Sequence, residues 1–363
     1  MKTTCDMMGP SGSPSAPSLG RAATPAAPSG MPLRMAIVGC GAIARAMHIP
    51  ACLAVEEVSL SALVDSDRSR VDAAATDFRV TVAATELSAV AGQVDAVVLC
   101  TPPHTHAGLA QGAFRLGLHV LCEKPLGNSA RECDAMIDAG RDAGRVLAVA
   151  HIFRHWPSRS AVRDVIRTGE FGAVQSVDVA QGNPYSWETA TGYNMRRELV
   201  PGGVLFDAGI HPLDTLLWWL GDPASFDYED DALGGLESNA RLRLGFAGGV
   251  KAVLRLSRTC RLANEFRVGC EHGTLVLSAY NPWQYEVRRA GAVEVRSCLP
   301  AAVDHCYCEQ AQVRDFAQSI RAGRAPRVTG EEAARAIHLI EDCYQARRVR
   351  PLPDMAPIPG LTW

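Results

Sequence analysis

The sequence predicts an α/β protein in which a doubly wound parallel sheet is followed by an antiparallel or mixed sheet. Three observations support this fold class. The chain has 363 residues, which suggests two domains rather than one. Its first part alternates short apolar runs with helical patterns of ten or more residues. Its later part contains consecutive strand-like runs joined by short links that contain glycine.

The alternating part of the chain begins at about residue 33 and ends at about residue 152. Strands are expected at residues 35–38, 58–64, 94–99, 119–122 and 146–150, and helices at 44–55, 69–77, 106–116 and 129–144. Parallel strands need helical crossovers, so this order predicts a parallel sheet with helices on both faces. We therefore assign residues 33–152 to the first domain.

The remaining residues, 153–363, form the second predicted domain. Strands are expected at 174–180, 240–246, 250–257, 265–270, 274–278, 284–289 and 293–297, and helices at 157–168, 203–220, 304–322 and 330–348. The last helix starts after Thr329 with Glu332 three residues on, which matches a capping box. The acidic run at 229–231 is interpreted as a solvated loop, with recognition of a cationic aminosugar as the less favoured alternative.

Composition excludes several classes of protein. Hydrophobic residues make up 47% of the chain and charged residues 21%, so a sizeable core can form. A net charge of −3 argues against nucleic acid or an anionic membrane as the main partner. No apolar run reaches the roughly 18 residues of a membrane span. The 12 cysteines lack zinc-site spacing, so we expect reduced thiols, no metal and a cytoplasmic location.

Residues 1–32 are rich in Ser, Pro, Ala and Gly and hold few large apolar side chains. Such a segment buries too little surface to offset the entropy of ordering, which predicts a disordered tail. A transit peptide is the weaker alternative.

A glycine-rich loop follows the first predicted strand and has the pattern G-x-G-x-x-A. It contains Gly39, Cys40, Gly41, Ala42 and Ile43. Between a strand and a helix, such a loop lets a pyrophosphate approach the backbone and the helix N-terminus. The pattern therefore predicts a dinucleotide site.

Asp65 ends the second predicted strand, where a carboxylate binds the ribose diol. A carboxylate there repels a 2′-phosphate, so NAD is favoured over NADP. Arg68 lies close enough in the sequence to leave NADP as the alternative.

Three further residues are candidates for the chemistry. Asp207 and His211 are four residues apart in the predicted helix 203–220 and would share one face. This pair suits a proton-transfer base, although a structural hydrogen bond is an equal alternative. Lys124 follows a strand at the edge where ligands bind, and its ammonium could stabilise alkoxide character. A solvated loop lysine is the alternative.

Taken together, these motifs resemble the glucose–fructose oxidoreductase / inositol dehydrogenase / MocA family from about Leu33 to Pro353. The resemblance implies a Rossmann domain and a second α/β domain with an open, mostly antiparallel sheet. That sheet would bind substrate and form a homodimer or homotetramer. One departure is Pro201, which stands where the family usually has the first of three glycines. The matching landmarks are the Gly39–Ala44 loop, Thr101-Pro102-Pro103-x-x-His106, Glu123-Lys124-Pro125 and Asp207-x-x-x-His211.

The resemblance also implies a reaction, namely hydride transfer between a sugar, aminosugar or cyclitol carbinol carbon and the nicotinamide. His211 would take the hydroxyl proton, Asp207 would orient His211 and stabilise its charged form, and Lys124 would hydrogen bond the reacting oxygen. The implied cofactor contacts, beyond the glycine loop and Asp65, are Thr101, Pro102, Pro103, His106, Glu123 and Lys124.

Polar and aromatic residues after the first domain are candidate substrate contacts, because such groups suit carbohydrate recognition. A packed surface loop is an equally good account of the later ones. The candidates are Arg154, Tyr185, Trp187, Asn194 and Arg196. Two other functions remain as alternatives: an NAD-using glycosidase that regenerates its cofactor, and a non-catalytic sensor of NAD and a sugar.

Overall fold

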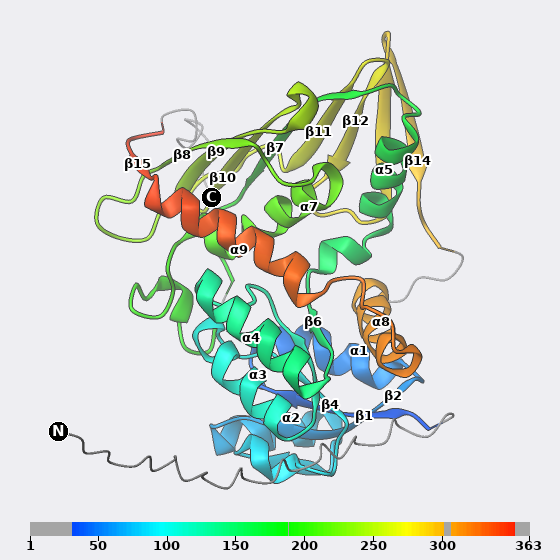
Figure 1. The fold of residues 1–363 in the computed structure, drawn as a ribbon, viewed down its shortest axis with the longest axis vertical. Coiled ribbons are helices and arrows are strands. Elements are labelled where there is room, and N and C mark those ends of the chain that lie inside the picture. Colours follow the sequence, from blue (N-terminus) through cyan, green and yellow to red (C-terminus); the bar gives the residue numbers. More distant parts are fainter. Residues whose placement is uncertain (1–30, 188, 301–305, 353–363) are drawn as a thin grey trace, which may run out of the picture.

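The computed structural model describes residues 31–187, 189–300 and 306–352. The expected N-terminal tail, apart from residues 31 and 32, lies outside these ranges. The same holds for the expected helix start at residue 304 and for residues 353–363. Two sheets with their flanking helices stand one above the other, with α9 (Gly330–Gln345) between them (Figure 1).

The first sheet has six parallel strands in the order β3-β2-β1-β4-β5-β6. The order reverses between β1 and β4, so a crevice is expected there at the carboxyl ends of the strands. The predicted parallel sheet is confirmed, although the short strand β3 was not predicted. The strands are β1 (Leu33–Val38), β2 (Val58–Val64), β3 (Val82–Ala84), β4 (Ala96–Leu99), β5 (His119–Cys122) and β6 (Leu147–Val149).

Helices cover both faces of this sheet. Ser129 and Asp67 cap two of them by accepting a hydrogen bond from the backbone three residues on. The helices are α1 (Ile49–Ala54), α2 (Arg68–Phe78), α3 (His106–Arg115) and α4 (Ala130–Ala143), with short turns at Ala44–His48, Leu87–Val90 and Pro103–Thr105.

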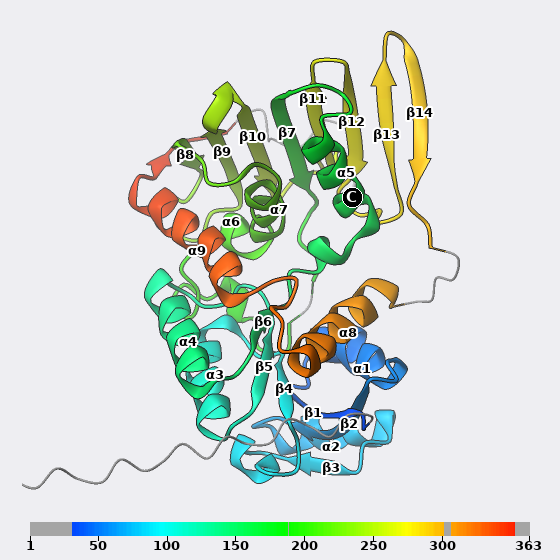
Figure 2. The same ribbon diagram turned by 45° about the vertical axis from the view of Figure 1, so that its right-hand side comes forward.

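One late helix also packs on the first sheet. In α8 (Tyr307–Ala322), Val313 and Phe316 are buried in the same cluster as β1 residues. Figure 2 shows α8 beside α1. The chain thus returns to the first sheet after completing the second.

The second sheet has nine strands in the order β14-β13-β12-β11-β7-β10-β9-β8-β15. The pairs β7–β10 and β8–β15 are parallel and the others antiparallel, which confirms a mixed, mostly antiparallel sheet. The strands are β7 (Val174–Gly182), β8 (Ser225–Asp230), β9 (Asn239–Gly245), β10 (Lys251–Ser257), β11 (Glu265–Cys270), β12 (Gly273–Ser278), β13 (Gln284–Arg289), β14 (Ala292–Ser297) and β15 (Arg348–Val349).

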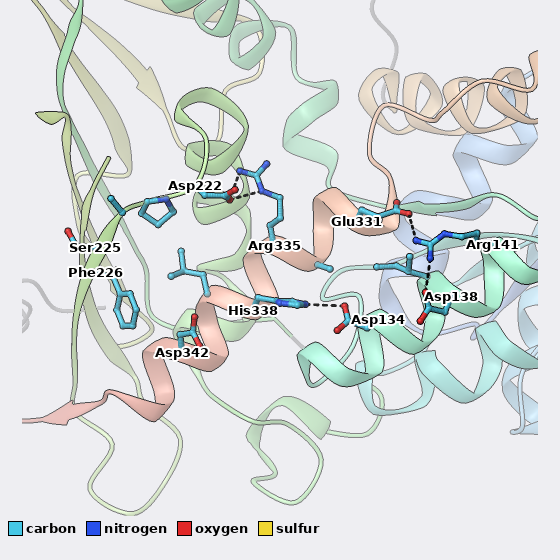
Figure 3. Close-up of a pocket in the computed structure, with 15 residues that line it drawn as sticks. Asp134, Asp138, Arg141, Asp222, Ser225, Phe226, Glu331, Arg335, His338 and Asp342 are labelled. Carbon is cyan, nitrogen blue, oxygen red and sulfur yellow. Dashed lines mark hydrogen bonds and ion pairs between the residues drawn. The ribbon is translucent and has the colours of Figure 1, made fainter. Parts of the chain in front are cut away.

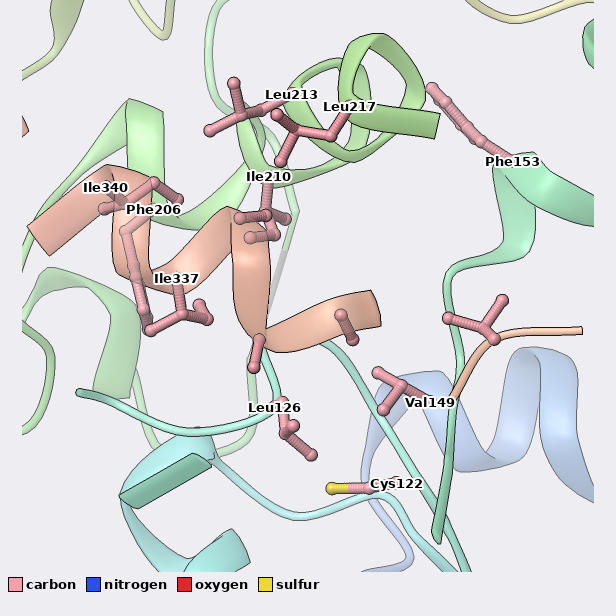
Figure 4. Close-up of a cluster of buried hydrophobic side chains, with 14 of the residues drawn as sticks. Cys122, Leu126, Val149, Phe153, Phe206, Ile210, Leu213, Leu217, Ile337 and Ile340 are labelled. Atoms are coloured by element: carbon pink, nitrogen blue, oxygen red, sulfur yellow. The ribbon is translucent and has the colours of Figure 1, made fainter. Parts of the chain in front are cut away.

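Helices lie against one face of the second sheet, and the burial of alternate residues in β9 and β10 follows from this. Apolar side chains of α6, α7 and α9 meet Leu126 and Val149 of the first unit in one continuous core (Figure 4). The helices are α5 (Pro157–Thr168), α6 (Val204–Asp207) and α7 (Ile210–Leu220), with short turns at Ile152–His155, Tyr193–Met195 and Ala247–Gly249.

The acidic run at 229–231 is not a solvated loop, so that interpretation was wrong. Glu229 and Asp230 end strand β8 and are 1% and 0% exposed. Arginines make this burial possible: Arg347 Nε lies 2.7 Å from Asp230 Oδ2, and Arg348 Nη2 lies 2.8 Å from Glu229 Oε1. A buried carboxylate is tolerated when it is paired in this way.

The predicted continuous helix over 203–220 was also wrong, because the chain breaks it into α6 and α7. A Cβ at Gly209 would lie 2.5 Å from Leu256 Cδ1 and 2.7 Å from the Leu205 carbonyl oxygen. The His211 N–H bonds to Ala208, at 3.4 Å, instead of the Asp207 carbonyl that a regular helix would use. The break therefore leaves the Asp207 carbonyl free for another donor.

Candidate active site

The glycine loop has the geometry that a pyrophosphate requires. Gly39 has φ +92°, and a Cβ there would lie 2.8 Å from Thr101 Cγ2 and 2.9 Å from the Cys100 carbonyl. At Gly41 a Cβ would meet nothing within 4 Å, so it would only fill the space in front of the loop. No side chain caps the helical turn that follows. A phosphate fits this free helix N-terminus.

Asp65 lies at the end of β2, beside the loop, and is buried. Its carboxylate accepts hydrogen bonds from Cys40 N at 2.8 Å and from Arg70 Nη1 at 2.9 Å. Arg68, which the sequence suggested as the nearby cation, instead pairs with Asp72 on the surface. Arg70 was missed because its proximity depends on how the first turn of α2 leaves the strand.

Lys124 extends from the loop after β5 toward the break between α6 and α7. Its Nζ donates to the Asp207 carbonyl oxygen at 3.0 Å and lies 3.8 Å from Asp207 Oδ1. The Lys124–Pro125 peptide bond is cis. Lys124 thus occupies the carbonyl that the helix break exposes, and the described residues give its Nζ no second hydrogen-bond acceptor.

Glu123 Oε1 lies 2.6 Å from His48 Nε2, and Glu123 Oε2 accepts a hydrogen bond from the Lys124 backbone N–H at 3.0 Å. Burial opposes its ionisation, but the His48 hydrogen bond and nearby charges hold the pKa of Glu123 below its usual value. The carboxylate of this predicted cofactor contact is therefore engaged in internal hydrogen bonds, which anchor the loop at Lys124.

His106 was expected to line the cofactor, and the structure corrects this. The side chain is 0% exposed, with Nε2 2.8 Å from the Thr101 carbonyl and Nδ1 3.0 Å from the Pro125 carbonyl. It therefore joins the loop after β4 to the loop that carries Lys124. Of the other predicted residues on the first loop, Pro103 is buried, whereas Pro102 and Thr101 are partly exposed.

Asp207 and His211 do not form the expected pair. Asp207 Oδ2 lies 2.9 Å from Nη2 of Arg258. The sequence did not suggest Arg258 as a site residue. The His211 ring stacks on Phe153 at 4.7 Å, and its buried Nδ1 has no hydrogen-bond partner among the described residues. Burial, with the charges of Lys124 and His151, holds the pKa of His211 well below its usual value. His211 is therefore a neutral imidazole near pH 7.

A buried group of titratable side chains next to His211 explains why Arg154 is inside the protein. The rings of His151 and His211 are 6.4 Å apart and perpendicular, and His151 Nδ1 is 3.8 Å from Asp214 Oδ2. Arg154 is 0% exposed and binds both oxygens of Asp214, at 2.9 and 2.7 Å. Its third nitrogen pairs with Glu332. The prediction of Arg154 as a substrate contact was wrong, because all its nitrogens are engaged inside the protein.

The loop at 183–196 holds the remaining candidates. Tyr185 and Asn194 are hydrogen bonded to each other through the hydroxyl and amide groups. Trp187 is 48% exposed. Arg196 pairs with Glu198 on the surface at 2.8 Å, so its guanidinium already has a partner there. Tyr193 was missed; burial, and then the charges of Asp207 and Glu123, raise the pKa of its hydroxyl.

A separate pocket of about 740 Å³ lies between α4, α9 and the start of β8. Figure 3 shows Arg335 facing Asp222 and His338 facing Asp134 across it. None of the predicted site residues lines this pocket. It therefore belongs to the contact between α4 and α9.

Three further observations concern metal ligands, cysteines and membrane-spanning helices. No group of three or more potential metal ligands occurs among residues 31–187, 189–300 and 306–352. Nine cysteines in these ranges are free thiols, namely Cys40, Cys52, Cys100, Cys122, Cys133, Cys270, Cys298, Cys308 and Cys343. None of the helices within the described residues is long and apolar enough to cross a membrane.

The doubly wound sheet and its glycine loop define an NAD-binding protein of the Rossmann class. A model of an oxidoreductase family with an NAD-binding Rossmann fold matches residues 33–151, and the GFO/IDH/MocA C-terminal domain matches residues 160–276. The chain therefore belongs to the GFO/IDH/MocA oxidoreductase family, as the sequence motifs had indicated.

Individual relatives support the same assignment. The chain is 28% identical to the dTDP-3,4-didehydro-2,6-dideoxy-alpha-D-glucose 3-reductase of Saccharopolyspora spinosa, covering 87% of this chain and 98% of the relative. It is 30% identical to the 1,5-anhydro-D-fructose reductase of Ensifer adhaerens, covering 67% and 75%. The crystal structure of aldose-aldose oxidoreductase from Caulobacter crescentus, complexed with glycerol, matches with a TM-score of 0.78 and 25% identity, covering 87% and 97%.

Proposed function

We propose that this enzyme transfers a hydride between a hydroxyl-bearing carbon of a sugar, aminosugar or cyclitol and NAD. The bound nicotinamide would supply the hydride acceptor or donor. The observation that carries the proposal is the position of Lys124, whose ammonium lies at the helix break between Asp207 and His211. The names of the relatives, which are sugar reductases, favour a carbohydrate substrate.

Lys124 would donate a hydrogen bond to the reacting oxygen of the substrate. Its contacts with the Asp207 carbonyl and carboxylate fix the direction of the ammonium and leave N–H groups for a ligand. A cation held in a partly buried site stabilises the negative charge that grows on an oxygen as its proton leaves.

His211 would accept the hydroxyl proton. Because its low pKa keeps the ring neutral, it is in the form that a base requires. In this arrangement Phe153, rather than Asp207, holds the ring in place. The Asp207 carboxylate acts instead beside Lys124 and Arg258.

Asp65 supports NAD as the cofactor, because its carboxylate would repel a 2′-phosphate. Arg70 beside it could bind that phosphate if Asp65 were neutral. We expect Asp65→Ser to raise the ratio of kcat/KM with NADP to that with NAD by about tenfold, since like-charge contacts cost on the order of 1 kcal/mol or more. An unchanged ratio would show that residues other than Asp65 determine the preference for NAD or NADP.

We further propose a cytoplasmic homodimer or homotetramer in which residues 33–152 bind the cofactor and 153–363 bind substrate and the partner copy. The nine free thiols named above support a reducing compartment. The less buried face of the nine-stranded sheet supports the oligomer, because this face carries the partly exposed residues of β9 and β10.

The experiment that tests the function is NADH absorbance with NAD and a panel of sugars, aminosugars and cyclitols. Net NADH formation with one of these substrates supports the proposal. Release of an aglycone from a glycoside without net NADH would indicate the glycosidase instead. Tight NAD binding with neither reaction would indicate the sensor.

A further inference from the structure

Arg258 follows the last residue of β10 and is buried, with only 7% of its side chain exposed. Its backbone N–H donates to the Ser238 carbonyl, which fixes the chain at this point. The side chain reaches two elements that are distant in sequence, namely α6 and the loop at 183–196.

The first contact is with the Asp207 carboxylate. Arg258 Nη2 donates to Asp207 Oδ2 at 2.9 Å and to the Gly203 carbonyl at 3.2 Å. Asp207 Oδ1 then faces Lys124 at 3.8 Å. The carboxylate is thus held between two cations, and the rigid guanidinium sets which oxygen faces Lys124.

The second contact is with the loop. The guanidinium carbon lies 5.2 Å from the centroid of the Tyr185 ring, a cation–π distance. The Tyr185 N–H donates to the Arg258 carbonyl at 2.8 Å. At the other end of the loop, Arg258 Nη1 lies 3.9 Å from Met195 Sδ. One side chain therefore touches both ends of the loop.

We propose that Arg258 is a positioning residue that couples the 183–196 loop to Asp207. The position of the loop ends and the direction of the Asp207 carboxylate toward Lys124 are then set by the same side chain. The kinetic consequence of this coupling rests on the proposed function, whereas the loop contact does not. Arg258 acts through Asp207 and Tyr185, and it is not itself a proton donor or acceptor in the reaction.

The kinetic test uses Arg258→Met and Arg258→Lys, with Arg255→Met as the matched control. Arg255 is on the same strand but pairs with Asp178 on a more exposed site. We expect Arg258→Met to lower kcat about tenfold or more, as for the loss of a buried charged hydrogen bond, with a smaller change in NAD affinity. Arg258→Lys should recover part of kcat, and Arg255→Met should leave it unchanged.

A double-mutant cycle separates coupling from general damage. In an Asp207→Asn background, Arg258→Met should cause little further loss of kcat, because the contact is already weakened. The same fold loss in both backgrounds would overturn the coupling.

Trypsin cleavage after Arg196 and Arg197, which are exposed at the end of the loop, provides a readout without substrate. We expect faster cleavage in Arg258→Met than in wild type or Arg255→Met, since cleavage follows local opening. Equal cleavage in all three would overturn the proposal. If Arg258→Met does not fold, the same comparison is made with Arg258→Lys. A cleavage rate and a kcat equal to those of wild type in Arg258→Lys would then overturn the proposal. If wild type turns over no sugar, the proposed function fails but this measurement still decides the coupling.

Discussion

Lys124 and His211 lie close enough for the lysine charge to lower the histidine pKa. They are held by different means, since Lys124 hydrogen bonds to the helix break while His211 stacks on Phe153. These different surroundings support the two roles that we propose, Lys124 as a hydrogen-bond donor and His211 as a neutral base. The same residues on a continuous helix would have placed Asp207 beside His211 instead.

The depressed pKa of His211 leads to a prediction for pH dependence. A base with a lowered pKa stays deprotonated until the pH falls below that value. We therefore expect kcat/KM for substrate oxidation to remain constant as the pH falls through about 6.5, which is the usual histidine pKa. The value of kcat/KM should decline only at lower pH. A pH–rate profile measures this. The prediction would be contradicted if kcat/KM were half-maximal at or above about pH 6.5 and this titration disappeared in His211→Gln.

Gly41 allows the cofactor site to be tested apart from the fold. A Cβ there meets no atom of the chain within 4 Å, so Gly41→Val should fold normally. It should nevertheless weaken NAD binding by about tenfold or more, because the side chain would occupy the space of the pyrophosphate. Calorimetric titration with NAD and a thermal melt measure the two effects. Unchanged NAD affinity would exclude this loop as the phosphate site.

At the scale of elements, the site depends on the break between α6 and α7. The break exposes the Asp207 carbonyl to Lys124 and separates Asp207 from His211. It is supported from outside by Glu237, which is buried and accepts hydrogen bonds from the N–H groups of Gly203 and Leu205 at the start of α6. The break is thus built into the packing between α6 and the sheet.

Gly209→Ala tests this packing. The added Cβ would lie 2.5 Å from Leu256 Cδ1 and 2.7 Å from the Leu205 carbonyl oxygen, so the Leu256 side chain and the backbone between α6 and α7 must both shift. Overpacking of this kind costs about 1–3 kcal/mol. We expect a loss of that size in the free energy of unfolding from urea titration. Gly235→Ala, where a Cβ meets nothing within 4 Å, should change it by less than about 0.5 kcal/mol. Equal effects of the two substitutions would argue against the close contact.

At the scale of the whole molecule, buried histidines link stability to pH. Burial lowers the pKa of His155 to about 4, while in the unfolded chain it would be about 6.5. The unfolded state therefore binds more protons as pH falls, and stability is lost between about pH 6.5 and pH 4. The pKa of His151 is also lowered by burial, so it acts in the same direction.

We expect His155→Asn to flatten the acid side of the stability profile, removing a dependence of about 2 kcal/mol between pH 7 and pH 5. Urea titrations at pH 7 and pH 5 measure the change in slope, which is independent of any packing loss. His338→Asn, at an exposed position on α9, is the control. An unchanged slope in His155→Asn would show that this ring is not buried in its neutral form.

The two sheets could be predicted because strand and helix periodicity are local, and the glycine loop could be recognised by its position between β1 and the following helix. What failed depends on distant partners. Strand β8 is buried because arginines near residue 350 pair with Glu229 and Asp230. The close packing at Gly209 involves Leu256 of a distant strand, and the roles of Arg70 and Arg258 depend on pairs formed only after folding.

The measurement that tests the central claim most directly is NADH formation by wild type and His211→Ala with the substrate found in the panel. The account predicts that kcat/KM falls by about 10²–10⁴ in the variant, as for loss of a general base. NAD affinity should stay within about twofold of wild type, because the proposed cofactor contacts are in the glycine loop and at Asp65 and do not include His211. Wild-type turnover in His211→Ala would contradict the proposed mechanism.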